Sequence, residues 1–298
     1  MTDEEVLRRF ESIRSWTRGD ARAPHKPLLV LLALARLQAD QTRLSYREIA
    51  PKLRDLITEY GPLSAQPRQY YPFWRLRNDG DLWTIDGALA MQAFQTANGD
   101  VSDKVLRAHD ATAGFSPSLA AVLRRRPSLL HKAARKVLDS SFPESMHDDI
   151  LDAVGFEYEV LRDTKAGPRN PDFRPTILRI YEGQCAMCGF GARLGNSNVG
   201  VEAAHVRPHC YGGPCVTENG VCLCSLHHRA FDGGALTIDA ELRIQVSEHL
   251  TGNGPVVESM IALAGTPLRR PMQGHPSVAE PYTKWHLKHV FKGPPRAA

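Results

Sequence analysis

The sequence predicts an α+β fold: a mainly helical N-terminal domain with a small β-hairpin or sheet, followed by a smaller domain built around metal-binding side chains. Two observations predict it. Apolar patterns of helical period fill much of the first half of the 298 residues, and all six cysteines lie between Cys185 and Cys224. With 42% hydrophobic and 23% charged residues, the composition is typical of a folded protein.

The strongest apolar run, Pro27–Leu37 (PLLVLLALARL), predicts a buried helix. It is too short to span a bilayer, and it contains Arg36. Pro27 suits the first turn of a helix, where a missing N–H costs nothing. His25 and Lys26 are therefore expected at the helix N-terminus, the positive end of its dipole.

A second helix is predicted over YREIAPKLRDLITEY, which follows Ser45. Ser45 and Glu48 have the spacing of a capping box, and Gly61 closes the run. Pro51 lies inside it, so a kink or a break into two shorter helices is an open alternative.

The segment 70–85, YYPFWRLRNDGDLWTI, predicts a β-hairpin, because aromatic and long side chains flank an Asn-Asp-Gly-Asp turn. The proline-rich segment 157–176 predicts a linker, which sets the domains at 1–156 and 177–298. Further helical patterns occur at Ser102–Asp110, at Pro117–Arg126 with Ser116 as the cap, and at Pro143–Val154.

In the second domain, the run PTILRIYEGQ predicts a short helix that leads to the CAMC motif. Leu236–Val246 alternates like a small hairpin. From Thr266 onward we expect an extended C-terminal arm with a short helix near Trp285.

The net charge of +4 is compatible with a nucleic-acid partner without identifying one. The N-terminus, MTDEEVLRRF, lacks the layout of a secretory signal, so we expect a cytoplasmic protein without a membrane partner. In that reducing compartment a disulfide framework is not expected, and the clustering of the cysteines favours a metal site.

Cys185 and Cys188, two residues apart, can form one half of a tetrahedral zinc site, and Cys224 and His227 can form the other half. Cys222 and Cys224 both lie on a predicted strand, and only one of them is expected to bind the metal. Cys224 is favoured because it has the partner at the right spacing. Other arrangements stay open, since further donors lie nearby: Cys210, Cys215, Cys222 and His209.

The stretch Val201–Gly234 resembles the HNH (ββα-metal) nuclease family. It reads A-H-V-R-P, then Gly-Gly, then E-N-G-V-C-L-C and S-L-H-H. The resemblance implies an HNH-type DNA endonuclease in which His205 ends the first strand and is the general base. It also implies that Asn219 orients the site and that His228, on the following helix, binds a divalent cation.

This chemistry needs a base that titrates near neutrality and a cation that neutralises charge on the phosphate and the leaving oxygen. A zinc ion with four protein ligands cannot act as this charge-neutralising cation. A separate Mg²⁺, or another divalent cation such as Mn²⁺ or Co²⁺, is therefore expected. Many HNH sites carry an acid directly before the first histidine, but here that residue is Ala204. Glu202, on the same strand face as Ala204, and Asp232 are the candidates for this ligand.

The N-terminal half carries APHKPLL (23–29), YYPFWRLRNDG (70–80) and FPESMHDDILDAVG (142–155). These segments resemble the sulfur-binding domain of type IV, modification-dependent restriction endonucleases that cleave phosphorothioate-modified DNA. Such enzymes commonly place this domain in front of an HNH domain, and the resemblance covers essentially the whole chain.

The resemblance implies a pocket in which Tyr71 and Pro72 form an apolar wall for the sulfur atom. His25 and Lys26 would contact backbone phosphate or base edges, and Arg75 would point toward the DNA. Simpler roles stay open: His25 and Lys26 would be only the solvated start of a helix, and the aromatic residues would be only the core of the hairpin.

The sequence thus predicts a restriction endonuclease that reads phosphorothioated double-stranded DNA and cuts it by a metal-dependent HNH mechanism. Two alternatives stay open: an HNH endonuclease that reads methylated or hydroxymethylated bases, and a zinc-stabilised DNA-binding regulator without catalysis. Because each chain has one active site, cutting both strands favours a homodimer.

Overall fold

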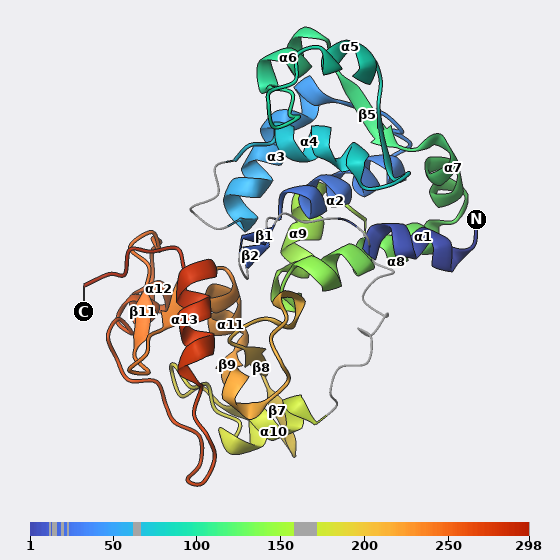
Figure 1. The fold of residues 1–298 in the computed structure, drawn as a ribbon. Coiled ribbons are helices and arrows are strands. Elements are labelled where there is room, and N and C mark those ends of the chain that lie inside the picture. The colour runs from blue at the N-terminus through green and yellow to red at the C-terminus, as the bar shows by residue number, and fades with distance from the viewer. Residues whose placement is uncertain are drawn as a thin grey trace. The chain divides into compact units, whose positions relative to one another are not determined.

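The computed structural model describes residues 1–11, 13, 17–18, 21–22, 24–61, 67–157 and 172–297. The chain divides into two units, Met1–Lys165 and Ala166–Ala298, each with its own buried core. Figure 1 follows the chain through both units. They are treated separately below.

The centre of the N-terminal unit is α2 (His25–Gln38), which is buried along most of its length, as the apolar run predicted. It packs against α3 (Tyr46–Tyr60), α4 (Tyr70–Arg75), α8 (Pro127–Ser141) and α9 (His147–Val154). Because other helices surround it, α2 can carry apolar side chains on all sides and needs no polar face toward solvent. His25 and Lys26 form its first turn, as expected.

The helix α3 confirms the second prediction, but two details differ. It runs unbroken through Pro51, so the alternative of two shorter helices is wrong. Ser45 makes no capping hydrogen bond with its side chain. It belongs instead to strand β3 (Leu44–Ser45), which pairs with β5 (Thr112–Phe115).

The predicted hairpin over 70–85 is wrong. Tyr70–Arg75 is α4, followed by a 3-10 turn at Leu76–Asn78, and only β4 (Trp83–Ile85) is a strand. β4 pairs with β5, which is some thirty residues further along, in a sheet of order β3-β5-β4. The aromatic residues that suggested two facing strands pack instead across this helix–strand junction, with the Phe73 and Trp83 rings edge to face at 6.2 Å.

The other predicted helices of this unit are confirmed as α6 (Asp103–Ala108), α7 (Pro117–Arg125) and α9, which a 3-10 turn precedes at Glu144–Met146. Among the described residues, no helix is long and apolar enough to cross a membrane. The remaining elements of the unit are α1 (Asp3–Glu11), β1 (Thr17–Arg18), β2 (Ala21–Arg22) and α5 (Ala88–Gln92).

The C-terminal unit opens with α10 (Phe173–Ile180), which begins inside the predicted linker 157–176; residues 158–171 of that segment lie outside the described residues. Next come β6 (Ala192–Leu194), β7 (Ser197–Val199), β8 (Val201–His205) and β9 (Gly220–Cys224), with 3-10 turns at His209–Tyr211 and Thr217–Asn219. The unit ends with α11 (Ser225–Asp232), β10 (Leu236–Ile238), β11 (Ile244–Val246), α12 (Pro255–Ile261) and α13 (Glu280–His289).

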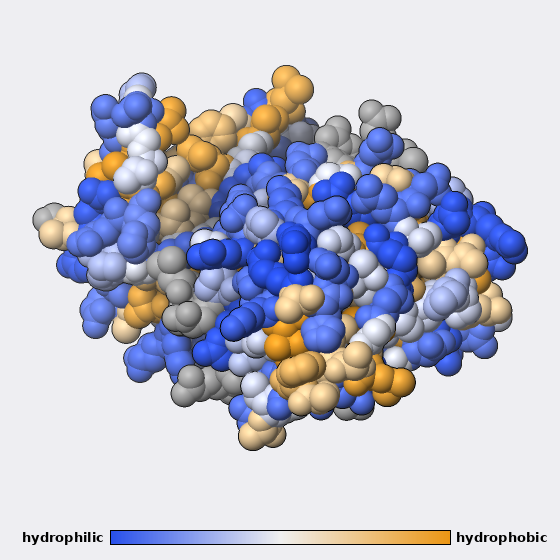
Figure 2. All heavy atoms as spheres, turned by 90° about the horizontal axis from the view of Figure 1, so that it is seen from above, coloured by the Kyte–Doolittle hydropathy of each residue, from blue (hydrophilic) through white to orange (hydrophobic). Residues whose placement is uncertain are grey.

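Two predictions for this unit are confirmed: the β10–β11 hairpin, and the helix around Trp285, which is α13. The helix α12 was not predicted. The face of the molecule in Figure 2 is mostly hydrophilic, with hydrophobic side chains in separate patches.

Candidate functional site

The frame of the candidate nuclease site is the antiparallel pair β8–β9 followed directly by α11. In this pair Val201 lies opposite Cys224 and His205 lies opposite Gly220. Cys224 and His205 are therefore at opposite ends of one short hairpin. The helix α11 packs against both strands and carries His227 and His228 in its first turns.

Four donors gather at the Cys224 end of the hairpin, namely Cys185, Cys188, Cys224 and His227. Their ligand atoms all lie within 4.8 Å of one another, and this is the only such group of three or more among the described residues. Cys222, the alternative on the same strand, is fully buried in the apolar core. Three thiols and one imidazole at this separation could hold a zinc ion.

Within this cluster the Sγ atom of Cys224 lies 3.1 Å from Nδ1 of His227, and Sγ of Cys185 lies 3.6 Å from the same nitrogen. A hydrogen bond from the Cys224 thiol lowers the pKa of Cys185 to about 3, and the same bond raises the pKa of Cys224. These contacts favour the thiolate form of Cys185, which is the form that zinc binds.

His228 lies between two carboxylates. Its Nδ1 is 2.6 Å from Oε2 of Glu202, and its Nε2 is 3.2 Å from Oδ2 of Asp232. The Glu202 side chain is 41% exposed, whereas that of Asp232 is 3% exposed. Ser225 Oγ donates a hydrogen bond of 2.7 Å to the other oxygen of Glu202. Glu202 is thus the more accessible acid, and Ser225, which sequence reasoning missed, holds it in place.

These contacts decide the charges of the group. Burial alone would lower the pKa of His228, but Asp232 and Glu202 outweigh it and raise that pKa to about 10. The hydrogen bond from His228, with one from Ser225, lowers the pKa of Glu202 to about 2 despite partial burial.

His205 ends β8 as expected, and two of its neighbours come from other segments. The ring of Phe173 stacks on the imidazole, with centroids 4.0 Å apart and planes 12° from parallel. Nε2 of His205 lies 3.3 Å from Sγ of Cys215. Sequence reasoning missed both neighbours, because nothing in the spacing links Phe173 or Cys215 to the motif.

Asn219 is fully buried and holds the loop that follows His205. Its Oδ1 accepts a 2.8 Å hydrogen bond from the Arg207 amide. Its Nδ2 donates to the carbonyls of Arg207 and Pro214, at 3.0 and 2.9 Å. The side chain therefore acts on the backbone and positions the loop rather than contacting a ligand.

In the N-terminal unit, Lys26 binds a buried carboxylate. Its Nζ lies 2.8 and 2.7 Å from the two oxygens of Asp79, whose side chain is 1% exposed. The pair joins the start of α2 to the turn that follows α4. The helix that begins with His25 and Lys26 also packs against α4, the helix that carries Tyr71 and Pro72.

Tyr71 is half-buried on α4, and two guanidinium groups lie near its ring, Arg75 at 4.9 Å and Arg68 at 5.3 Å. Arg75 makes a bidentate ion pair with the buried Asp100, at 2.5 and 2.6 Å. Pro72 is buried. Arg68 and Asp100 were missed, although the i,i+3 spacing of Arg68 and Tyr71 was a usable signal.

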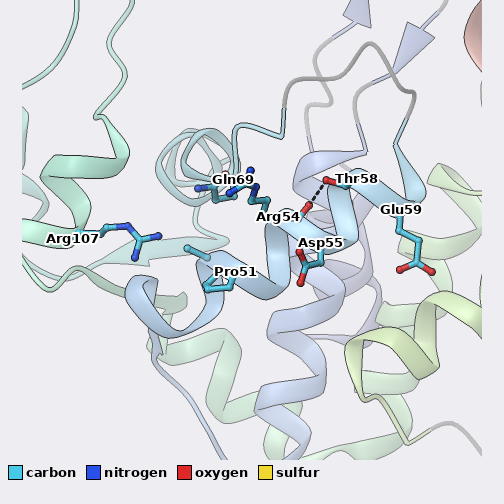
Figure 3. A pocket seen from close by; sticks show the side chains of 8 residues that line it. Pro51, Arg54, Asp55, Thr58, Glu59, Gln69 and Arg107 are labelled. Carbon is cyan, nitrogen blue, oxygen red and sulfur yellow. Dashed lines mark hydrogen bonds between the residues drawn. The ribbon is translucent and has the colours of Figure 1, made fainter.

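A cavity of about 570 Å³ lies along α3, and none of the predicted site residues lines it. Figure 3 shows that its polar lining mixes both charges: Arg54, Asp55, Thr58, Glu59, Gln69 and Arg107. Arg107 is held by Asp103 at 2.8 Å. We assign this cavity no part in the candidate site.

The comparisons with known proteins concern both units. Residues 3–159 match the family model described as "ScoMcrA-like, DNA sulfur-binding domain", and residues 185–239 match the model described as "HNH endonuclease". No curated protein matches the chain significantly.

The similar solved structures include the sulfur-binding domain of ScoMcrA complexed with phosphorothioated DNA. It is 24% identical over 50% of this chain and 94% of that one, with a TM-score of 0.44. The type IV phosphorothioation-dependent restriction endonuclease ScoMcrA is 26% identical over 60% of this chain and 39% of that one, also with a TM-score of 0.44. The modification-dependent restriction endonuclease TagI is 22% identical over 43% and 40%, with a TM-score of 0.32.

Proposed function

Because the chain belongs to the family of ScoMcrA-like DNA sulfur-binding domains, we propose that it is a restriction endonuclease that binds phosphorothioate-modified DNA and hydrolyses nearby phosphodiester bonds. The observation that carries the proposal is the joining of this family segment, in one chain, to an HNH segment whose histidines lie on a β-hairpin and its following helix.

In the nuclease unit, His205 is the proposed general base, and Asn219 holds the loop beside it. Glu202 and His228 are the proposed ligands of the catalytic cation, which when bound neutralises charge on the phosphate and the leaving oxygen. The fit is supported by the accessible Glu202 carboxylate, which faces an imidazole nitrogen at 2.6 Å. Oxygen and nitrogen donors suit Mg²⁺, Mn²⁺ or Co²⁺.

The four donors Cys185, Cys188, Cys224 and His227 are the proposed structural zinc site. Their donor set and separation fit zinc, and these four side chains would fill all four coordination positions of the ion. This site would therefore stabilise the strand–helix frame and take no part in the hydrolysis.

In the reader unit we propose that Tyr71 and Pro72 contact the sulfur atom, while His25, Lys26 and Arg75 contact the neighbouring backbone. Sulfur is larger and less strongly hydrated than oxygen, so an aromatic and proline surface can favour it. The pairing of Lys26 and Arg75 with buried carboxylates keeps these cations in place and limits their attraction for unmodified DNA.

The decisive experiment is cleavage of a phosphorothioated plasmid and an unmodified plasmid of the same sequence, with Mg²⁺, Mn²⁺ or Co²⁺. We expect cutting of the modified plasmid alone. His205→Ala should abolish cutting and leave binding of modified DNA intact, whereas His275→Ala, at a half-buried position of the same unit, should change neither.

Equal binding of the two DNAs would refute the sulfur-reading role, and normal cutting by His205→Ala would refute the catalytic assignment. Failure to nick any modified DNA would favour a DNA-binding regulator. Since one chain supplies one nuclease site, we also expect two copies to act on one duplex.

A further inference from the structure

The imidazole of His205 is held from two directions that the HNH motif does not include. Phe173, from the first turn of α10, covers one ring face at a centroid distance of 4.0 Å. The thiol of Cys215, from the loop before β9, lies 3.3 Å from Nε2. A stacked ring restrains the plane of the imidazole, and a hydrogen-bonding group on one nitrogen restrains its rotation within that plane.

The place of Phe173 depends on the strand partner of His205. A Cβ atom on Gly220 would lie 2.3 Å from Cδ1 of Ile177 and 3.0 Å from Cζ of Phe173. Glycine at this position thus lets α10 pack directly on the hairpin. Phe173 is itself only 8% exposed, so its ring has little freedom to leave the stack.

The place of Cys215 depends on Asn219. The buried amide of Asn219 donates to the carbonyl of Pro214, the residue before the thiol. The preceding residue, Gly213, is equally constrained, because a Cβ there would lie 1.8 Å from the carbonyl oxygen of Arg207. Two close backbone approaches therefore fix the loop that presents the thiol.

We propose that Phe173 and Cys215 are positioning residues for His205, and that Cys215 selects its tautomer. The inference rests on the proposed nuclease function. The Nε2–H of His205 donates to the Cys215 sulfur, which leaves the acceptor lone pair on Nδ1. Nδ1 is then the atom that takes the proton from water. The water oxygen keeps the electron pair and bonds to phosphorus. The bond between phosphorus and the leaving oxygen breaks, its electron pair stays on that oxygen, and the oxygen takes up a proton from solvent. The imidazolium then returns its own proton to solvent.

Nuclear magnetic resonance can test the tautomer without any DNA. In the full chain with ¹⁵N-labelled histidine, two-bond ¹H–¹⁵N correlations identify which ring nitrogen carries the proton, and His205→Ala assigns the signals. We expect the Nε2–H tautomer in the unmodified chain and a mixture of tautomers in Cys215→Ala. An Nδ1–H tautomer in the unmodified chain, or an unchanged spectrum in Cys215→Ala, would overturn the proposal.

Single-turnover cleavage tests the consequence. Cys215→Ala and Phe173→Leu should each slow cutting roughly 10- to 100-fold with unchanged affinity for modified DNA. Cys215→Ser and Phe173→Tyr, which keep a hydrogen-bonding group and a stacked ring, should recover most of the rate. Cys210→Ala removes another half-buried thiol and should have no effect.

If Cys215→Ala cuts at the normal rate, the positioning role is wrong even though the nuclease assignment stands. If the unmodified chain cuts no DNA, the proposed function fails, and the resonance experiment still decides which tautomer the thiol selects.

Discussion

Asn219 provides the sharpest test of how the candidate site is built. Its amide makes three hydrogen bonds to the backbone of Arg207 and Pro214, and it is fully buried. In Asn219→Ala one N–H and two carbonyl groups lose their partner. At about 1 kcal/mol for each hydrogen bond, we expect the C-terminal unit to lose about 3 kcal/mol of stability.

A second variant, Asn219→Asp, tests the same hydrogen bonds with a buried charge added. In Asn219→Asp the carboxylate can still accept the hydrogen bond from Arg207, but it cannot donate to the two carbonyls, and it buries a charge beside them. We therefore expect a loss at least as large as in Asn219→Ala. Asn196→Ala, at an exposed position of the same unit, should stay within about 0.5 kcal/mol of the unmodified chain.

Hydrogen exchange is the suitable assay, because the two units need not unfold together. A loss of about 3 kcal/mol corresponds to exchange roughly 100-fold faster at the amides of β8 and β9. Amides of the N-terminal unit serve as the internal reference and should not change. A loss below about 1 kcal/mol in Asn219→Ala would show that these hydrogen bonds do not hold the loop.

Three further predictions concern other parts of the chain. Cys188→Ser, or removal of zinc by a chelator, should raise hydrogen exchange throughout the C-terminal unit and leave the N-terminal unit protected; equal changes in both units would contradict a structural zinc site. Burial lowers the pKa of His286 from 6.5 to about 3, so the folded unit keeps it neutral. As pH falls below 6.5 the unfolded chain takes up a proton that the folded chain does not, so stability should fall by up to about 1.4 kcal/mol per pH unit. His286→Asn, which can still accept a hydrogen bond from Thr237, should weaken this slope, measured by denaturant unfolding between pH 7 and pH 5. Lys26→Met should destabilise the N-terminal unit by about 3 kcal/mol, because it leaves the Asp79 charge buried without a partner. The added change Asp79→Leu should restore most of this loss in a thermal unfolding assay, and no restoration would mean that the charge is not the cause.

The sequence was most informative where function depends on local spacing. The resemblance to the HNH family implied that His205 ends a strand and that His228 lies on the following helix, and the structure has β8 and α11 there. The spacing of Cys224 and His227 also favoured Cys224 over Cys222 as the ligand, and the structure places Cys224 in the donor cluster and Cys222 in the core. Such predictions depend on short spacings along the chain, which can be identified in a single sequence.

The failures arose where distant segments decide the outcome. Tyr70–Arg75 has the aromatic composition of a strand, but β4 takes its partner from β5, so the aromatic segment is left to form a helix. Ser45 precedes α3 as expected, but its side chain makes no capping hydrogen bond, and its backbone pairs with β5. Phe173 and Cys215 reach His205 from segments 32 residues before it and ten after it, distances over which no periodicity connects side chains.

The length of the β8–β9 hairpin fixes the distance between the donor cluster and His205. Its five residue pairs run from Val201–Cys224, at the end with the donor cluster, to His205–Gly220 at the other end, about 13 Å along the strands. Since side chains alternate faces, deleting one residue from β8 would do more than shorten it. It would turn His205 to the opposite face, away from Phe173, while leaving the donor cluster at the other end unchanged. Under the proposed function, the number of residues between the two ends therefore matters for cleavage as much as the identity of the histidine does. A one-residue deletion should then give a folded protein that keeps the donor cluster and does not cut DNA.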